Sequence, residues 1–359
     1  MSRVRRADFV PDVVWVQRED GWFIRLDRKE DQEAWDKLAN SDEYVITQVD
    51  DGAGTYGADR GIFPTSSSSA PGVIHEMLNL LDLHSGMDVL EIGTGTGFNA
   101  ALLAESVMPG YITTVEVDES VADHAREALL KAGVSATVVM GDGTCGYEDN
   151  APYDRIICTA SALSVPYTWI EQTRPGGRIV LPYTGSFDRG AFLCLIVDGY
   201  GGASGKFHGT ASFMRLRGHR AGRALWQIWN TADAHTTTTE EYLREPFVEY
   251  DAGFALGLLL PGWMTAEREE DDGEILLMSD RVSNSWATVR PANNGSVTYE
   301  VHYDGPHRLW VELEAAYRWW TDAGRPDQTR FGTTVTPEGQ TFWLDSPDRT
   351  LPNGTIRWE

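Results

Sequence analysis

The chain has 359 residues, a length that is generous for one domain and suits two. It carries 54 acidic and 30 basic side chains, which gives a formal net charge of −24 at pH 7. Such a chain repels phosphate backbones, so we expect no nucleic-acid substrate and a cationic or weakly charged partner. The alternative is that the acidic surface only aids solubility.

Three cysteines form no C-x-x-C pair, and an odd number without a secretory leader indicates reduced thiols in a cytoplasm. Residues 1–15 are basic but lack an apolar core of secretory length, and no run of residues approaches a membrane span. We therefore expect a cytoplasmic protein with no membrane segment, and no metal site.

Residues 1–60 form a mixed segment. Residues 14–17 and 22–25 predict a β-hairpin around Glu19, Asp20 and Gly21. We expect this segment to pack beside the entrance for the substrate.

The glycine turn after residue 92 is the strongest motif in the chain. Val89, Leu90 and Ile92 predict a buried strand, and the three glycines of Gly93-Thr-Gly95-Thr-Gly97 let the backbone turn sharply against a ligand. A dinucleotide fingerprint needs G-x-G-x-x-G, whose third glycine would fall at Phe98. A pyrophosphate site is therefore disfavoured.

The downstream elements alternate between strand and helix. Strands are predicted at residues 113–116, 136–140, 153–158 and 178–181, and a helix at residues 119–132 that stops at Gly133. This order predicts an α/β Rossmann-like sheet of parallel strands with helices on both faces and its ligand at the carboxyl ends.

Acidic residues at these strand ends suggest the cofactor. Glu91 either faces a positively charged sulfonium or supports the turn, Glu116 suits ribose hydroxyls, and Asp142 suits the exocyclic amine of adenine. Together they favour S-adenosylmethionine over NAD. The candidate cofactor-binding residues are Glu91, Gly93, Thr94, Gly95, Gly97, Asn99, Glu116, Val117, Gly141, Asp142, Gly143 and Thr159.

Residues 61–218 resemble the protein-L-isoaspartate O-methyltransferase family. The segments VLEIGTGTGFNAALLA, TVEVDES, GDG, YDRIICTAS and PGGRIVLP stand in that family's order and spacing. The resemblance implies a class I methyltransferase fold, and it aligns Ser69 with the family's active-site serine and Ser67 with a nearby threonine. The chain has Gly72 and Ile74 where the family has histidines.

The hydroxyl-rich segment Thr65-Ser-Ser-Ser-Ser69 is the candidate cradle for the methyl acceptor. An aspartyl carboxylate is already ionised at neutral pH, so methyl transfer needs alignment rather than a base. Hydroxyls orient a carboxylate without neutralising it, and we therefore take Ser67, Ser68 and Ser69 as the catalytic candidates. The alternative is that Ser68 or Ser69 only caps the helix that begins near Pro71.

Residues 219–359 are predicted to form an α+β accessory domain that recognises the substrate. Its pattern predicts strands within 285–301, a helix at 308–321 and a hairpin at 331–344. Before it, strands at 192–197 and 211–215, separated by a glycine-rich turn at 199–209, are predicted at the edge of the methyltransferase sheet. The acidic run at 267–274 is expected to be a solvated loop, with peptide docking as the alternative.

The added domain and the serine-rich segment are similar to family members that modify ribosomally made peptides, such as graspetides or lanthipeptides. The resemblance implies an enzyme that esterifies an aspartyl side chain in a macrocyclic peptide and so leads to an aspartimide or isoaspartate. We expect the protein to be a monomer. Repair of isoaspartyl residues in damaged proteins is the alternative. A catalytically inactive cofactor-binding protein is the second alternative.

Overall fold

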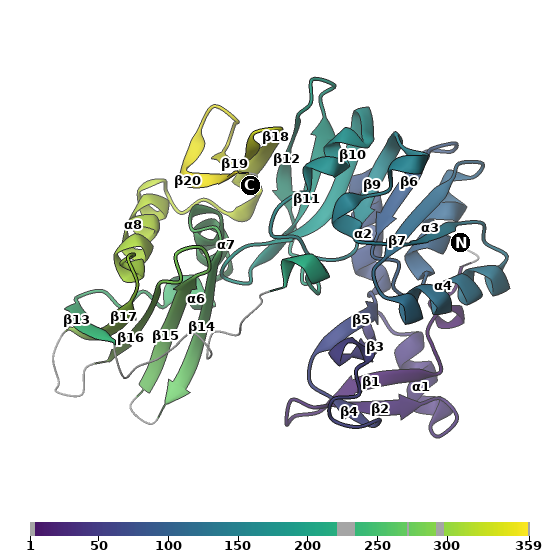
Figure 1. Ribbon diagram of the computed structural model, residues 1–359, viewed down its shortest axis with the longest axis horizontal. Coiled ribbons are helices and arrows are strands. Elements are labelled where there is room, and N and C mark those ends of the chain that lie inside the picture. The colour runs from purple at the N-terminus through teal and green to yellow at the C-terminus, as the bar shows by residue number, and fades with distance from the viewer. Residues whose placement is uncertain (1–3, 221–233, 271–272, 292–297, 358–359) are drawn as a thin grey trace.

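The computed structural model describes residues 4–220, 234–270, 273–291 and 298–357. The described residues form three sheets: a five-stranded N-terminal sheet, a central sheet of ten strands, and a five-stranded sheet within residues 235–304, which we call the C-terminal sheet. The C-terminal sheet is inserted in the chain before the last three strands of the central sheet. Figure 1 shows the N-terminal sheet below the parallel half of the central sheet, and the C-terminal sheet at the far left. Among the described residues, no helix is long and apolar enough to cross a bilayer.

The parallel half of the central sheet confirms the predicted α/β order. Its strands follow the order β10-β9-β6-β7-β8, and the neighbouring pairs are all parallel. The strands are β6 (Val89–Ile92), β7 (Ile112–Glu116), β8 (Thr137–Met140), β9 (Tyr153–Cys158) and β10 (Thr173–Thr184). All four residues of β6 are buried, as expected of a central strand covered on both faces.

Helices cover both faces of this half. Apolar side chains of α2 (Pro71–Leu81), α3 (Phe98–Val107) and α4 (Glu119–Ala132) pack on one face. The predicted helix at 119–132 is confirmed, and it ends at Gly133 with φ +69°. The short helix α5 (Tyr167–Glu171) contributes to the core on the other face.

An antiparallel half extends the same sheet from β10. Its further strands are β11 (Gly190–Val197), β12 (Ala203–His208), β18 (Phe331–Thr336), β19 (Gly339–Leu344) and β20 (Thr350–Arg357). The predicted hairpin at 331–344 is confirmed. The strand predicted at 211–215 is wrong: the partner of β11 is β12, inside the glycine-rich stretch that we expected to be only a turn.

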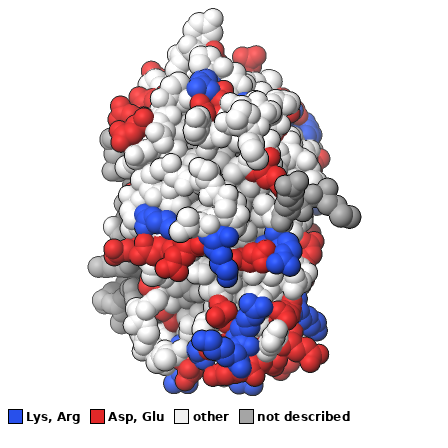
Figure 2. All heavy atoms as spheres, turned by 90° about the vertical axis from the view of Figure 1, so that its right-hand side faces the viewer, with Lys and Arg blue, Asp and Glu red and all other residues white. Residues whose placement is uncertain are grey.

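The N-terminal sheet contains the predicted hairpin and, unexpectedly, the serine segment. The sheet consists of β1 (Val13–Gln17), β2 (Phe23–Asp27), β3 (Val45–Val49), β4 (Arg60–Gly61) and β5 (Pro64–Ser68), with α1 (Gln32–Ala39) packed against it. Strand β5 pairs with β3 at the edge of this sheet, so Ser66, Ser67 and Ser68 lie on a strand, and Ser69 follows its end. On the face shown in Figure 2, acidic and basic side chains lie side by side in a band across the middle and at the lower end.

The C-terminal sheet is wholly antiparallel. It consists of β13 (His235–Thr239), β14 (Trp263–Glu270), β15 (Gly273–Asp280), β16 (Trp286–Pro291) and β17 (Tyr299–Asp304), and α6 (Glu245–Val248), α7 (Tyr250–Leu259) and α8 (Leu309–Asp322) accompany it. The predicted helix at 308–321 is confirmed as α8. The loop expected at 267–274 is wrong, because β14 and β15 form a hairpin there whose tip, residues 271–272, lies outside the described residues. Residues 292–297, within the region 285–301 where strands are predicted, also lie outside them.

Short 3-10 helices occupy several connections. They are Arg6–Asp8, Asp50–Gly52, Gly143–Cys145, Glu148–Asn150, Arg217–His219 and Gln328–Arg330.

Helix α7 joins the C-terminal sheet to the central one. Eight of its residues, Ala252 to Leu259, are buried. The Phe254 ring lies edge-on to Phe207 of β12, with ring centroids 5.0 Å apart, and edge-on to Phe331 of β18. A buried aromatic side chain of this kind contributes about 1.5–3 kcal/mol to folding. Hydrogen bonds between β12 and β18 also cross the boundary expected near Gly218, and the division into residues 61–218 and 219–359 stays a prediction.

Candidate functional site

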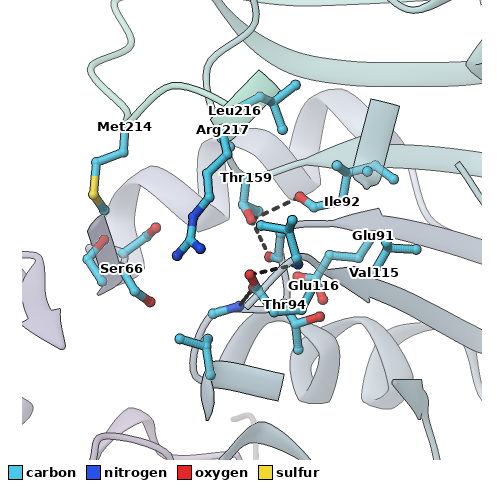
Figure 3. A pocket seen from close by; sticks show the side chains of 18 of the residues that line it. Ser66, Glu91, Ile92, Thr94, Val115, Glu116, Thr159, Met214, Leu216 and Arg217 are labelled. Atoms are coloured by element: carbon cyan, nitrogen blue, oxygen red, sulfur yellow. Dashed lines mark hydrogen bonds between the residues drawn. The ribbon is translucent and has the colours of Figure 1, made fainter. Parts of the chain in front are cut away.

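One pocket gathers the serine segment, the glycine turn and a third segment that the sequence analysis did not single out. Residues 65–69, the turn at 91–96 and the strand ends at Glu116 and Thr159 all line it (Figure 3). The third segment is residues 214–220, which we call the strap. Met214, Leu216 and Arg217 of the strap lie over the pocket in Figure 3.

Most of the predicted cofactor residues line this pocket. They are Glu91, Gly93, Thr94, Gly95, Asn99, Glu116, Val117, Asp142, Gly143 and Thr159. Gly97 and Gly141 are not among its lining residues. Gly97 has φ +82° and precedes α3, where an added Cβ would lie 3.2 Å from Leu129. Because Gly97 has no side chain, helix α3 can begin in close contact with α4.

Glu91 is fully buried, and each of its carboxylate oxygens has a partner. Asn99 Nδ2 donates to Oε1 at 2.7 Å, and Thr114 Oγ1 donates to Oε2 at 2.6 Å. Burial raises the pKa of Glu91 to about 7, although these two hydrogen bonds oppose the rise. The carboxylate therefore changes charge within the physiological range, and a cation in the pocket would favour its ionised form.

Glu116 ends β7 with its carboxylate turned toward the glycine turn. Its Oε2 accepts from the Gly95 amide at 3.0 Å, and its Oε1 accepts from the amides of Val117 at 3.0 Å and Asp118 at 3.2 Å. Burial raises the pKa of Glu116, while these amides and the charge of Arg217 oppose the shift. The Glu116 carboxylate thus lines the pocket, where its oxygens could accept hydrogen bonds from the ribose hydroxyls predicted for it.

Two other predicted residues stabilise turns. Asp142 is exposed, and its Oδ1 accepts from the amide and hydroxyl of Thr144 at 2.9 Å each. Thr159 donates its hydroxyl to the Gly93 carbonyl at 2.7 Å, which ties the end of β9 to the glycine turn.

The serine strand lies directly against the glycine turn. A Cβ added at Gly95, where φ is +54°, would lie 3.3 Å from the Ser67 carbonyl oxygen. The buried Ser68 hydroxyl accepts from Thr96 Oγ1 at 3.5 Å. Ser67 and Ser69 are half-buried in the pocket.

The helix-cap alternative for the serines does not hold. Helix α2 begins at Pro71 as predicted, but its N-cap is Ala70 and no side chain caps it. Instead, the buried Arg6 donates to the Ser69 carbonyl at 3.2 Å and to four other backbone carbonyls of the N-terminal sheet region, which fixes the end of the serine strand. The serine hydroxyls are thus not required for capping.

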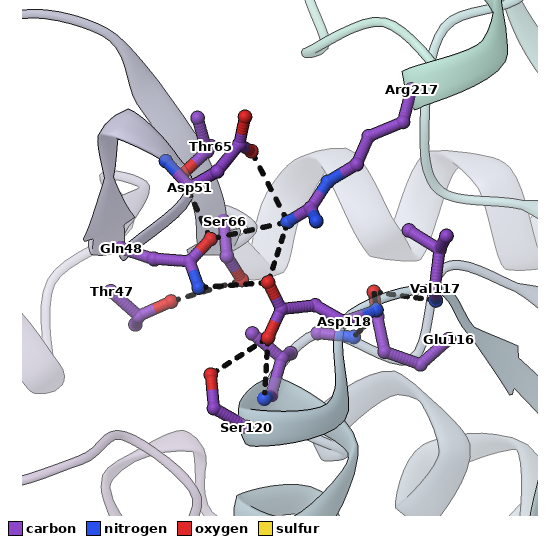
Figure 4. A network of polar contacts seen from close by, with 12 residues as sticks. Thr47, Gln48, Asp51, Thr65, Ser66, Glu116, Val117, Asp118, Ser120 and Arg217 are labelled. Atoms are coloured by element: carbon purple, nitrogen blue, oxygen red, sulfur yellow. Dashed lines mark hydrogen bonds and ion pairs between the residues drawn. The ribbon is translucent and has the colours of Figure 1, made fainter. Parts of the chain in front are cut away.

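The strap contains the functional candidate that the sequence analysis missed. Arg217 enters the pocket and contacts Gln48, Asp51 and Asp118 (Figure 4). A signal was available: residues 199–232 contain no Asp or Glu, in a chain otherwise rich in both, and Arg215, Arg217 and Arg220 stand within them.

Comparison with known proteins places this site in a family. Residues 42–192 match the family model described as protein-L-isoaspartate(D-aspartate) O-methyltransferase. A protein-L-isoaspartate O-methyltransferase of Pyrococcus horikoshii is 38% identical over 157 residues, which cover 43% of this chain and 70% of that protein. One from Thermococcus onnurineus is 42% identical over 153 residues, covering 42% of this chain and 69% of that protein.

Solved structures resemble the chain more distantly. A protein-L-isoaspartate O-methyltransferase structure aligns with a TM-score of 0.47 and 20% identity, covering 83% of this chain and 84% of that one. A Plasmodium falciparum structure, described as a putative protein-L-isoaspartate O-methyltransferase in complex with S-adenosyl-L-homocysteine, aligns with a TM-score of 0.41 and 13% identity. That alignment covers 50% of this chain and 83% of the other.

Proposed function

This chain belongs to the protein-L-isoaspartate O-methyltransferase family, and from that premise we propose that it methylates the carboxylate of an isoaspartyl residue in a protein or peptide. It is an S-adenosylmethionine-dependent O-methyltransferase. The observation that carries the proposed acceptor is the contact between the serine strand and the glycine turn, because it places hydroxyl donors beside the cofactor residues in one pocket.

The pocket fits S-adenosylmethionine chemically. Asn99 Oδ1 is buried and has no hydrogen-bond partner among the described residues, so an acceptor is free for an ammonium donor. Glu91 suits a cationic neighbour, and the Glu116 carboxylate suits ribose hydroxyls. When bound, the cofactor supplies an activated methyl group on a sulfonium.

The residues of the chain then have to align the acceptor carboxylate with the methyl group and to shield both from water; they do not have to move a proton. An ionised acceptor carboxylate needs no general base. We assign its orientation to Ser67 and Ser69, whose hydroxyls would donate to one oxygen and leave the other free to attack. Such alignment is worth up to about 7–11 kcal/mol in favourable cases. The buried Ser68 would hold the strand against the turn through Thr96.

A modified ribosomal peptide is the second candidate substrate. Residues 193–359, which include the strap and the C-terminal sheet, lie outside the family match, and the strap lines the pocket. A macrocyclic aspartyl peptide of the graspetide or lanthipeptide kind would use this additional surface. Its ester would then be attacked by the neighbouring backbone nitrogen to give an aspartimide, with loss of methanol.

Mass spectrometry of two acceptors tests the proposal. A linear isoaspartyl peptide and a macrocyclic aspartyl peptide of the same composition are incubated with full-length enzyme and S-adenosylmethionine. A carboxyl ester adds about 14 Da, and an aspartimide formed from it lies about 18 Da below the starting peptide, because the chemistry fixes both masses. Esterification of the linear isoaspartyl peptide supports the first candidate, and aspartimide from the macrocycle alone supports the second. Modification of neither would contradict carboxyl methylation of a peptide.

A further inference from the structure

The strap is held firmly enough to present a side chain at a fixed place. Backbone hydrogen bonds join it to Ser161, three residues after the end of β9: the Ser161 amide donates to the Met214 carbonyl at 2.8 Å, and the Leu216 amide donates to the Ser161 carbonyl at 2.9 Å. Ser161 itself is fully buried. From this base the Arg217 side chain extends into the pocket, between Ser66 and Glu116 in Figure 3.

Arg217 is anchored through a single nitrogen. Its Nη2 lies 2.8 Å from Asp118 Oδ2, 3.3 Å from Gln48 Oε1 and 3.2 Å from Asp51 Oδ1 (Figure 4). Its Nη1 and Nε make no hydrogen bond to any residue within the described ranges, and the side chain is 28% exposed. A guanidinium has five donors in one plane, so a guanidinium held at one corner leaves an edge open to a ligand.

The surrounding carboxylates do not saturate this arginine. Asp118 has its other oxygen engaged by the Ser120 hydroxyl and the Val121 amide. Asp51 is shared, because both of its oxygens accept from Arg220 Nη1, at 2.8 and 2.9 Å. The third strap arginine, Arg215, pairs with Asp188. Arg217 and Arg220 both line the pocket, and Arg217 is the one whose side chain extends between Ser66 and Glu116.

We propose that Arg217 binds a second carboxylate of the acceptor, so that the preferred substrate is an acidic peptide with Asp or Glu beside the residue that is methylated. This inference rests on the proposed function. A carboxylate held by a guanidinium is a poorer nucleophile than one held by hydroxyls, so the reacting group belongs at the serines and the charged partner at the arginine. An open edge of Arg217 matches a carboxylate in planar, two-point geometry.

The competing explanation is a purely structural latch. In that account Arg217 only ties the strap to the N-terminal sheet through Gln48 and Asp51, and the acceptor's neighbouring residue does not matter. The two accounts differ in the effect of Asp51, which is an anchor in a latch but a competitor for the guanidinium in a binding site.

Two acceptor peptides that differ only in Glu or Gln next to the methylated residue separate these accounts. We expect the full-length enzyme to show a kcat/KM about tenfold higher for the Glu peptide, mostly through KM, as suits one charge-assisted contact. In Arg217→Gln this ratio should fall to about one, and Arg217→Lys should retain part of it. Arg126→Gln on the surface of α4 is the matched control and should keep the full ratio.

Asp51→Asn gives the decisive comparison. If Arg217 binds substrate, removing this competitor keeps or increases the preference for the Glu peptide. A latch predicts instead that Arg217→Gln and Asp51→Asn slow both peptides alike with the ratio unchanged, and that result would overturn the inference. Equal rates on both peptides with the unaltered enzyme would overturn it as well while leaving carboxyl methylation intact. Methylation of neither peptide would overturn the proposed function and this inference together.

Discussion

The two walls of the pocket are built in different ways. The cofactor wall comes from residues 91–159, a continuous stretch that forms neighbouring parallel strands in the order β9-β6-β7-β8, so its contacts are local to one sheet. The acceptor wall combines β5 of the N-terminal sheet with the strap, about 150 residues later in the chain. The residues of the cofactor wall can therefore be predicted almost completely from the sequence. Those of the acceptor wall depend on how segments far apart in the chain pack together.

The largest expected effect tests whether the cofactor wall is independent of the C-terminal sheet. Phe254→Ala removes a buried ring that packs on Phe207 and Phe331, and we expect unfolding to become easier by about 3–5 kcal/mol. Calorimetric melting measures this, and Tyr200→Ala, at a ring 95% exposed, is the control and should change little. S-adenosylmethionine affinity of the folded Phe254→Ala protein should stay near that of the parent. A large loss of affinity would show that the two regions are coupled.

The next effect sharpens the role of the cofactor wall. Glu116→Ala removes the acceptor proposed for two ribose hydroxyls, each worth about 1.5–3 kcal/mol, so binding of S-adenosylmethionine should weaken at least a hundredfold. Isothermal calorimetry measures the change. Glu119→Ala, three residues on and exposed at the start of α4, should bind like the parent. Equal affinities for all three proteins would remove Glu116 from the site.

The pH dependence of cofactor binding should follow Glu91. Its pKa is raised to about 7 by burial, and a sulfonium favours the ionised carboxylate, so affinity should rise as pH rises through 7. For one group this amounts to about tenfold between pH 6 and pH 8. In Glu91→Gln the side chain cannot ionise, so any pH dependence of affinity that remains comes from groups other than residue 91, including those of the cofactor. A parent profile that matches the Glu91→Gln profile would contradict the assignment.

The smallest effect belongs to the acceptor wall. Ser69→Ala should lower kcat about fivefold to tenfold, because one of the two hydroxyls proposed to orient the acceptor carboxylate is lost, and should leave S-adenosylmethionine affinity unchanged. Radiometric methyl transfer measures the rate, and Ser106→Ala on the outer surface of α3 serves as the control. If kcat is unchanged in Ser69→Ala but falls in Ser67→Ala, the acceptor contact lies one side chain earlier on the strand.

Local signals made the cofactor wall predictable. The apolar run of β6, the glycines after it and the helix at 119–132 with its terminal Gly133 each follow from a few neighbouring residues, and the structure confirms these elements. The turn residues were found because positive φ angles require glycine there.

The remaining elements were not predicted correctly, mainly because they depend on strand pairing between segments far apart in the sequence. Four consecutive serines have no apolar alternation, so nothing in them indicated that Ser66, Ser67 and Ser68 would pair with Val45–Val49 in a sheet. Strand β12 is rich in small residues, and its second partner, β18, lies more than 120 residues away. The acidic hairpin at 267–274 was taken for a loop because charge suggests solvent, yet an exposed strand satisfies its backbone through its neighbour alone.

The hydrogen-bonded ladder between β12 and β18 limits how this enzyme can open. It makes the central sheet continuous across the boundary near Gly218, and helix α7 closes the same seam with buried side chains. Hinged rotation of the residues after Gly218 at this seam would break backbone pairs and expose an aromatic core. Displacing the strap instead breaks two backbone bonds at Ser161, the bond from the Leu163 amide to His219, and the polar contacts of the strap arginines. Movement of the seven strap residues, rather than of a whole domain, should therefore control entry of the peptide and release of the product. Because salt screens the ion pairs of the strap, added salt should increase the rate at which the strap opens.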